Sequence, residues 1–198
     1  LFVDEAKGIL KMLKKPVIWN GESQMTGDVV ELIYNNEQQA IDSLKVYNNV
    51  FIVDKDSISG GYNQIKGHHL IGLFTDNKID TVKIDRNTEV LFYTRNDKDE
   101  LIGIDKTLSS SIDLYFEDND IIGIKFNNEA KGKLYPESKL PKNARLLPGF
   151  HWRESERIKD ITDLLKDKPK LDLPKIRGID LPDPPEAFFE EEEDEELN

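Results

Sequence analysis

The sequence predicts an all-β fold in which antiparallel strands stack into an elongated assembly or a two-sheet jelly roll. Apolar and polar residues alternate with a period of two along several runs, and turns rich in Asn and Asp separate these runs. The whole pattern repeats about every 40 residues. Because one such unit cannot hide its own apolar face, we expect the units to pack on one another, with roughly 4.8 Å between neighbouring strands.

Each predicted unit opens with a short turn that leads into a first strand. QMTG (24–27) recurs as QIKG (64–67), and the third unit has LSSS (108–111) at this position. The strand that follows ends in an aromatic residue and a polar turn, whose Asn and Asp residues tolerate left-handed backbone and favour tight connections. The strands with their turns are VVELIYNN (29–36), HLIGLFTDN (69–77) and SIDLYFEDN (111–119), and the turn pairs are Asn35-Asn36, Asp76-Asn77 and Asp118-Asn119.

A second strand and a third strand complete each unit. The second runs share a frame in which one lysine, at position 45, 83 or 125, stands between two apolar residues. This alternation predicts apolar side chains toward the interior and lysine toward solvent. The second runs are IDSLKVYNN (41–49), IDTVKIDRN (79–87) and IIGIKFNN (121–128), and the third runs are VFIV (50–53), VLFY (90–93) and GKLY (132–135).

The first 23 residues resemble the end of an earlier unit. A turn at 4–8 precedes ILKML, and PVIW (16–19) stands just before the first full unit. An amphipathic helix from Asp4 to Lys15 is the alternative, but each later unit also places a short apolar run ahead of its opening turn. We therefore expect one repetitive β domain over residues 1–150, with units at about 24–60, 64–105 and 108–136.

The repeat stops beyond about residue 136. In GFHW (149–152), Phe150 and Trp152 are expected to form a cap over the last strands, and SERIKDITDLLKD (155–167) predicts one short helix. From Lys168 onward the chain is dense in Pro and acidic residues with little to bury, so residues 151–198 are expected to hold a short helix followed by an extended tail.

Composition excludes several classes of protein. The net charge is −12, of which the acidic run at 190–196 supplies −7, so the body is only mildly acidic and has no basic surface for nucleic acid. No apolar run approaches the roughly 18 residues of a membrane span, so a soluble or peripheral protein is expected. The chain has no Cys, which excludes disulfides and thiol nucleophiles. An export signal, if the gene encodes one, lies outside this chain.

Catalytic and metal sites find no support in the sequence. His68 and His69 are adjacent, but neighbouring side chains of a strand point to opposite faces, so we expect no shared metal ion. Paired acids such as Glu117 and Asp118 fall in predicted turns, and a glycosidase pair stays open because carboxylate separation is a three-dimensional property. No phosphate loop, nucleophile elbow or HExxH motif is present. We expect no enzyme and no cofactor.

The repeated runs carry a family resemblance. PVIWNGESQMTGDVVELIYNN (16–36), GGYNQIKGHHLIGLFTDNKIDTVKI (60–84) and SSSIDLYFEDNDIIGIKFNNEAKGKLYPE (109–137) resemble the OstA-like proteins of Bacteroidetes-type bacteria, relatives of the periplasmic lipopolysaccharide transport protein LptA. The resemblance covers roughly residues 1–155. It implies a twisted β jelly roll of the cell envelope, located in the periplasm.

The resemblance also implies a ligand and partners. Family members hold the acyl chains of lipopolysaccharide (lipid A) between their sheets, associate end to end and work with other envelope transport components in outer-membrane assembly. The inward apolar residues that would line the groove are Leu32, Tyr34, Leu44, Val46, Leu70, Phe74, Val82, Ile84, Leu114, Phe116, Ile124 and Phe126. Two functions stay open: a noncatalytic lipid carrier, or a β-stack scaffold of the envelope that recruits partners without binding lipid.

Overall fold

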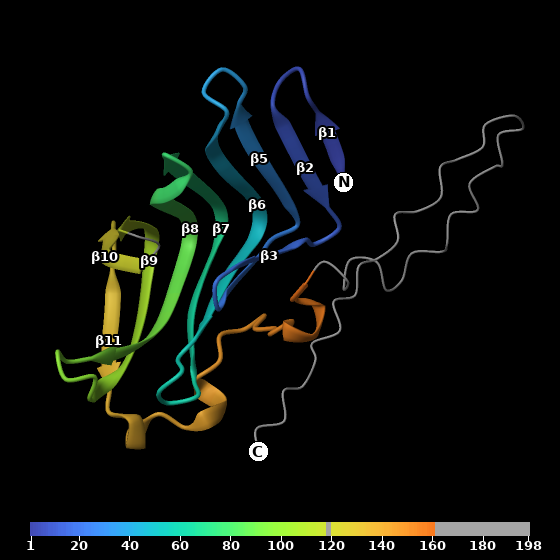
Figure 1. Ribbon diagram of the computed structural model, residues 1–198. Helices are drawn as coiled ribbons and strands as arrows, with labels where there is room; N and C mark the ends of the chain where they lie inside the picture. The colour runs from blue at the N-terminus through green and yellow to red at the C-terminus, as the bar shows by residue number, and fades with distance from the viewer. Residues whose placement is uncertain (118–119, 161–198) are drawn as a thin grey trace, which may run out of the picture. The chain divides into compact units, whose positions relative to one another are not determined.

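The computed structural model describes residues 1–117 and 120–160, which form eleven β-strands and three single-turn 3-10 helices (Figure 1). None of the helices in these two ranges is long and apolar enough to cross a membrane. The strands are β1 (Phe2–Asp4), β2 (Ile9–Leu13), β3 (Val17–Asn20), β4 (Ser23–Thr26), β5 (Val29–Asn35), β6 (Ala40–Lys55), β7 (Tyr62–Thr75), β8 (Lys78–Arg95), β9 (Leu101–Glu117), β10 (Asp120–Asn127) and β11 (Lys131–Tyr135), and the helices are η1 (Glu137–Lys139), η2 (Lys142–Ala144) and η3 (Glu154–Glu156).

All eleven strands belong to one antiparallel sheet that bends back on itself. β4 and β5 pair with two different halves of β6, and β10 and β11 pair with two different halves of β9. The upper half of the sheet therefore holds β1, β2, β5 and β10 with one half of each long strand, and the lower half holds β3, β4 and β11 with the other (Figure 1). The predicted fold class, a jelly roll of stacked antiparallel strands, is confirmed.

The bend runs along a line of residues that we call the fold line. Four pairs on it have left-handed backbone, with φ between 52° and 67°. Gly27, between β4 and β5, and Gly67, on β7, also lie on this line. An added Cβ would lie 2.2 Å from Val46 Cγ1 at Gly27 and 2.3 Å from Ile84 Cγ2 at Gly67. Glycine is needed here because inner side chains approach the backbone closely. The left-handed pairs are Lys14-Lys15, Asn48-Asn49, Arg86-Asn87 and Asn128-Glu129.

The fold line corrects two predictions about strand boundaries. The second and third runs of the first two units were expected to be separate strands, but each pair forms one long strand, β6 or β8, bent at residues 48–49 or 86–87. A β-bulge there shifts the ladder without ending it. QMTG, QIKG and LSSS were expected to be turns, but QIKG lies within β7 and LSSS within β9, and QMTG comprises the last three residues of β4 and the glycine after them.

The turn and strand predictions near the N-terminus are confirmed. Residues 9–13 form a strand and not a helix, and residues 5–8 form a turn that ends at Gly8 with φ +62°.

Asp76 and Asn77, with φ 51° and 61°, connect β7 and β8 as the predicted two-residue turn. The Asp118-Asn119 turn, most of the helix predicted for 155–167 and the acidic tail lie outside the described residues.

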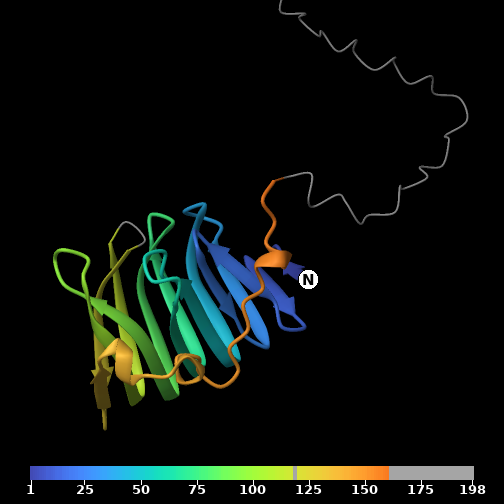
Figure 2. The ribbon, with the colours of Figure 1, turned by 90° about the horizontal axis from the view of Figure 1, so that it is seen from below.

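Residues 136–157, which we call the strap, cover the outer face of the lower half. The strap runs from β11 across the sheet to β3 (Figure 2). Phe150 packs against Tyr62 with ring centroids 5.0 Å apart, and Trp152 packs against Trp19, also at 5.0 Å. The predicted cap over the last strands is therefore wrong in its position, because Phe150 lies over β7 in the middle of the sheet and Trp152 lies over β3 at the opposite edge.

Candidate functional site

The interior between the two halves of the sheet is the main candidate site. Side chains alternate strictly across the lower half, so Val50, Ile52 and Val90 face the interior while Val53 and Leu91 face the strap. The inner faces of the upper and lower halves together build one continuous apolar cluster along the sheet. Its buried members are Val30, Leu44, Val46, Val50, Ile65, Leu70, Val82, Ile84, Val90, Ile112 and Leu114.

The predicted groove residues divide into three groups by exposure. Six are buried, with 0–6% of their surface exposed: Leu44, Val46, Leu70, Val82, Ile84 and Leu114. Five are half-buried and pack against the same cluster: Leu32, Phe74, Phe116, Ile124 and Phe126. Tyr34 is 38% exposed and is not among the residues that pack against the cluster, so its place in a groove stays a prediction.

A cavity opens where the half-buried residues reach the upper rim. It has a volume of about 390 Å³ and lies beside the turn between β7 and β8. Ile79 and Phe116 supply apolar walls, and polar or charged side chains surround them. A cavity that combines two apolar side chains with polar and charged ones suits the junction between the apolar and polar parts of an amphiphile. The remaining lining residues are Thr75, Asp76, Lys78 and Asp80.

The lower half contributes interior residues that the groove prediction missed. Met25, Ile52, Ile65 and Phe92 all pack into the cluster from below. Ile52 and Phe92 belong to the alternating runs VFIV and VLFY, and Met25 and Ile65 to QMTG and QIKG. A run interpreted as a separate strand or as a turn gives no reason to place these residues in the same interior as the upper half. The alternation of these residues was therefore visible in the sequence, but the continuity of the strands through the fold line was not.

The outer face of the upper half mixes charged and apolar side chains: Ile71, which is 45% exposed, stands between Lys45 and Lys83 of the neighbouring strands. Lys11 Nζ lies 2.7 Å from Glu31 Oε1, and the hydroxyl of Tyr47 donates to Glu31 Oε2 at 2.9 Å. The hydrogen bond from Lys11, helped by that from Tyr47, lowers the pKa of Glu31 below its usual value although partial burial opposes it. Paired charges therefore hold part of this face, on which exposed apolar side chains such as Leu73 also lie.

The two adjacent histidines lie together on the fold line. The rings of His68 and His69 have centroids 4.3 Å apart, and Nδ1 of His69 lies 3.2 Å from Oδ1 of Asp85. The expectation that these rings point to opposite faces is wrong, because the register shift between Lys66 and His69 breaks the alternation. Within residues 1–117 and 120–160, no group of three or more metal-ligating side chains is close enough to hold an ion.

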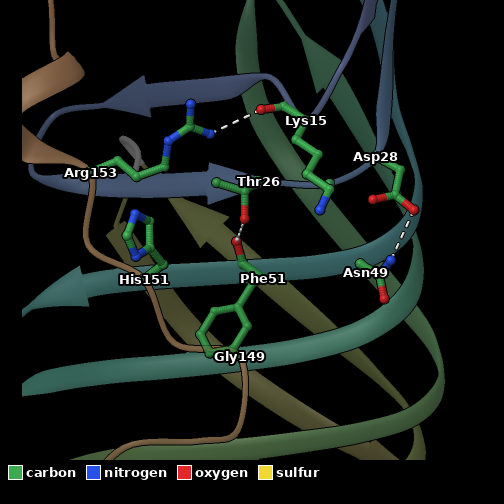
Figure 3. Close-up of a pocket in the computed structure, with 9 residues that line it drawn as sticks. Lys15, Thr26, Asp28, Asn49, Phe51, Gly149, His151 and Arg153 are labelled. Atoms are coloured by element: carbon green, nitrogen blue, oxygen red, sulfur yellow. Dashed lines mark hydrogen bonds between the residues drawn. The ribbon is translucent and has the colours of Figure 1, made fainter.

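A second cavity, of about 310 Å³, lies between the strap and the fold line (Figure 3). Nη1 of Arg153 donates to the carbonyl of Lys15 at 2.9 Å on one side, and Nδ2 of Asn49 donates to Asp28 at 2.9 Å on the other. Basic and acidic side chains both line it, together with Phe51. This mixed polar lining distinguishes the cavity from the apolar interior, and the bond from Arg153 to Lys15 joins the strap to the fold line beside it.

The fold has a counterpart among solved structures, while no family model and no curated protein matches the chain. The structure is similar to the crystal structure of LptH from Pseudomonas aeruginosa, described as the LptA-homologous periplasmic component of the lipopolysaccharide transport device. The TM-score is 0.50 at 11% identity, and the match covers 68% of this chain and 90% of LptH. The chain therefore has an LptA-like fold.

Proposed function

We propose that the protein is a noncatalytic lipopolysaccharide-binding protein of the periplasm, which carries lipid acyl chains in the apolar interior between the two halves of its sheet. The observation that carries the proposal is the continuous apolar cluster whose half-buried side chains, among them Phe74 and Phe116, reach a cavity at the upper rim. The likeness of the fold to LptH supports the same ligand class. Acyl chains would enter at this rim, because the apolar residues nearest the fold line, Val46, Leu70 and Ile84, are at most 1% exposed.

The proposal includes association of copies or of related transport proteins end to end. The sheet ends in β1 and β3 on one side and in β10 and β11 on the other, and each of these strands pairs with a single neighbour. Phe2 and Val3 on β1 are 56% and 51% exposed. Edge strands of this kind carry backbone groups that can pair with another chain.

Binding of purified lipopolysaccharide to Phe74→Asp and Leu73→Asp variants tests the proposal. The two residues are neighbours on β7, but Phe74 packs into the interior cluster whereas Leu73 is 50% exposed on the outer face. A carboxylate in the interior should reduce lipid capture at least about tenfold, because burying a charge in an apolar site is costly. Leu73→Asp should bind as the wild type does. Equal capture by both variants, with both folded, would refute an interior lipid site.

A scaffold of the cell envelope without lipid binding is the second candidate. It is favoured by the tight packing of Val46, Leu70 and Ile84, which leave at most 1% of their surface exposed. If the wild-type chain captures no lipopolysaccharide but retains envelope proteins in pull-down, and loses them on deletion of residues 168–198, the scaffold function is supported and lipid carriage is not.

A further inference from the structure

The strap is fastened to the sheet by two buried glutamine side chains. Gln64 Nε2 donates to the carbonyl of Arg145 at 2.8 Å, and its Oε1 accepts from the N–H of Leu147 at 2.8 Å. Both glutamines are almost fully buried, at 0% and 1% exposure for Gln64 and Gln24. Each amide therefore bonds to the strap backbone as a neighbouring strand would.

Gln24 repeats the same arrangement six residues further along the strap. Its Nε2 donates to the carbonyl of His151 at 2.8 Å, and its Oε1 accepts from the N–H of Arg153 at 2.6 Å. Gln24 and Gln64 lie on β4 and β7, which are separated by β6, so the amides are about 10 Å apart. Six extended residues would span about 20 Å, and a turn closed by Phe150 N–H and Leu147 C=O at 3.0 Å takes up the difference.

Apolar contacts complete this docking face. Phe51, Val53, Leu91, Tyr93 and Ile104 of the lower half form a second buried cluster with Leu140 and Leu147 of the strap. In the part of the chain that the structure describes, every hydrogen bond from strap to sheet uses a side chain on one side, and the backbone bonds of the strap close only its own turns. The backbone ladders of the sheet therefore include no bond to the strap.

We propose that the outer face of the lower half is a docking site for an extended polypeptide, which the chain's own strap fills in this structure. The partner is an extended segment whose backbone repeats the contacts of the strap. The C=O of residue i and the N–H of residue i+2 bond to Gln64, as Arg145 and Leu147 do, and the C=O of residue i+6 and the N–H of residue i+8 bond to Gln24. Residue i+2 carries an apolar side chain, as Leu147 does. A partner protein with such a segment would bind when the strap is released. This site is separate from the lipid-carrying interior, because the two lie on opposite faces of the same strands.

The strap excludes such a partner because it is covalently attached to the sheet through β11. An attached segment acts at an effective concentration in the millimolar range, so a free segment of equal intrinsic affinity competes poorly. A strap that carries a charge at a buried position should lose this advantage without changing the face itself. Leu147 suits this purpose because it is 2% exposed, and Leu146 beside it is a matched control because it is 44% exposed.

The test measures binding of a fluorescent peptide of residues 137–156 to full-length Leu147→Asp and Leu146→Asp proteins. We expect at least about tenfold tighter binding to Leu147→Asp than to Leu146→Asp or the wild type. A peptide N-methylated at the positions of Leu147 and Arg153, which removes the N–H groups that bond to Gln64 and Gln24, should lose that binding.

Three results would overturn the proposal. The peptide fails to bind Leu147→Asp, or the N-methylated peptide binds equally well, or hydrogen exchange shows that the amides of β7 and β8 lose protection together with the strap. The last result would show that the strap and the sheet unfold as one unit, so that no separate docking face exists. A milder strap variant, Trp152→Ala, repeats the exchange measurement in case the charge itself disturbs the sheet.

Discussion

Replacing Gly67 with alanine should destabilise the protein by about 1–3 kcal/mol, because overpacking a close core contact costs this much. The new Cβ would lie 2.3 Å from Ile84 Cγ2 and 3.2 Å from the carbonyl oxygen of Asp85. Carbon atoms pack at roughly 3.5–4.0 Å, so one side must move by more than an ångström. Ile84 has 0% exposure and lies in the centre of the interior cluster, so it cannot give way toward solvent.

Gly72 on the same strand provides the control. A Cβ there would find its nearest neighbour, Val82 Cγ2, at an ordinary 3.6 Å, so Gly72→Ala creates no clash. Alanine also restricts the unfolded chain, which stabilises a compatible site by about 0.4–1 kcal/mol. The two variants should therefore differ by about 1.4–4 kcal/mol in the free energy of unfolding, measured by urea denaturation.

A double variant identifies the clashing atom. Ile84→Leu removes the Cγ2 methyl at nearly constant volume, so it should recover part of the loss caused by Gly67→Ala, with a coupling energy of about 1 kcal/mol or more. Equal unfolding free energies for Gly67→Ala and Gly72→Ala, or a coupling energy of zero, would contradict the view that the glycine exists to admit Ile84 at the bend.

Two other outcomes follow from side-chain contacts. Gln64→Leu should lower the free energy of unfolding by about 2–4 kcal/mol, because it leaves two buried backbone groups of the strap unpaired. Gln38→Leu, at an exposed turn, should change it by almost nothing. A similar loss of stability in both variants would contradict the role of the buried amide. The pKa of Glu31 is lowered chiefly by Lys11, so their pair stabilises the fold above the unfolded-state pKa and is lost as the pH falls through the lowered pKa. The urea midpoints of the wild type and Lys11→Met should therefore differ at pH 7 and converge in acid, and a constant difference would refute the coupling.

The alternation of side chains was the part of the fold that the sequence could predict. In a strand, a residue's neighbours two positions away share its face, so Leu44 and Val46 or Val82 and Ile84 could be placed in the interior without knowledge of the partner strands. The two-residue turn at Asp76-Asn77 was equally readable, because its residue types match left-handed backbone.

The bend was not predictable from the same signals. Asn48-Asn49 has the composition of a turn, and a local pattern cannot tell a hairpin from a bulge that redirects a continuing strand. The difference is decided by the partner strand β7, which pairs with β6 on both sides of residues 48–49. The adjacent histidines were misplaced for the same reason, since regular alternation does not hold across a bulge.

The strap was missed because its contacts are long-range and use no periodic pattern. Gln64 bonds to residues 81 and 83 positions away, and Gln24 to residues 127 and 129 positions away. The repeat of Gln24 and Gln64 was visible in the sequence and was attributed to turns. A polar residue recurring at a buried strand position is a signal for a shared external partner, and here that partner is the strap backbone.

The length of the strap is matched to the width of the sheet that it crosses. The strap begins after β11 and ends where Arg153 and Arg157 bond to Lys15 and Glu22 at the opposite edge, so its length must suit the number of strands in the lower half. One additional unit would insert two strands, or about 10 Å, and only about three more extended residues would span that gap. A chain could thus gain a whole unit of sheet at the expense of a very small insertion in the segment that closes it.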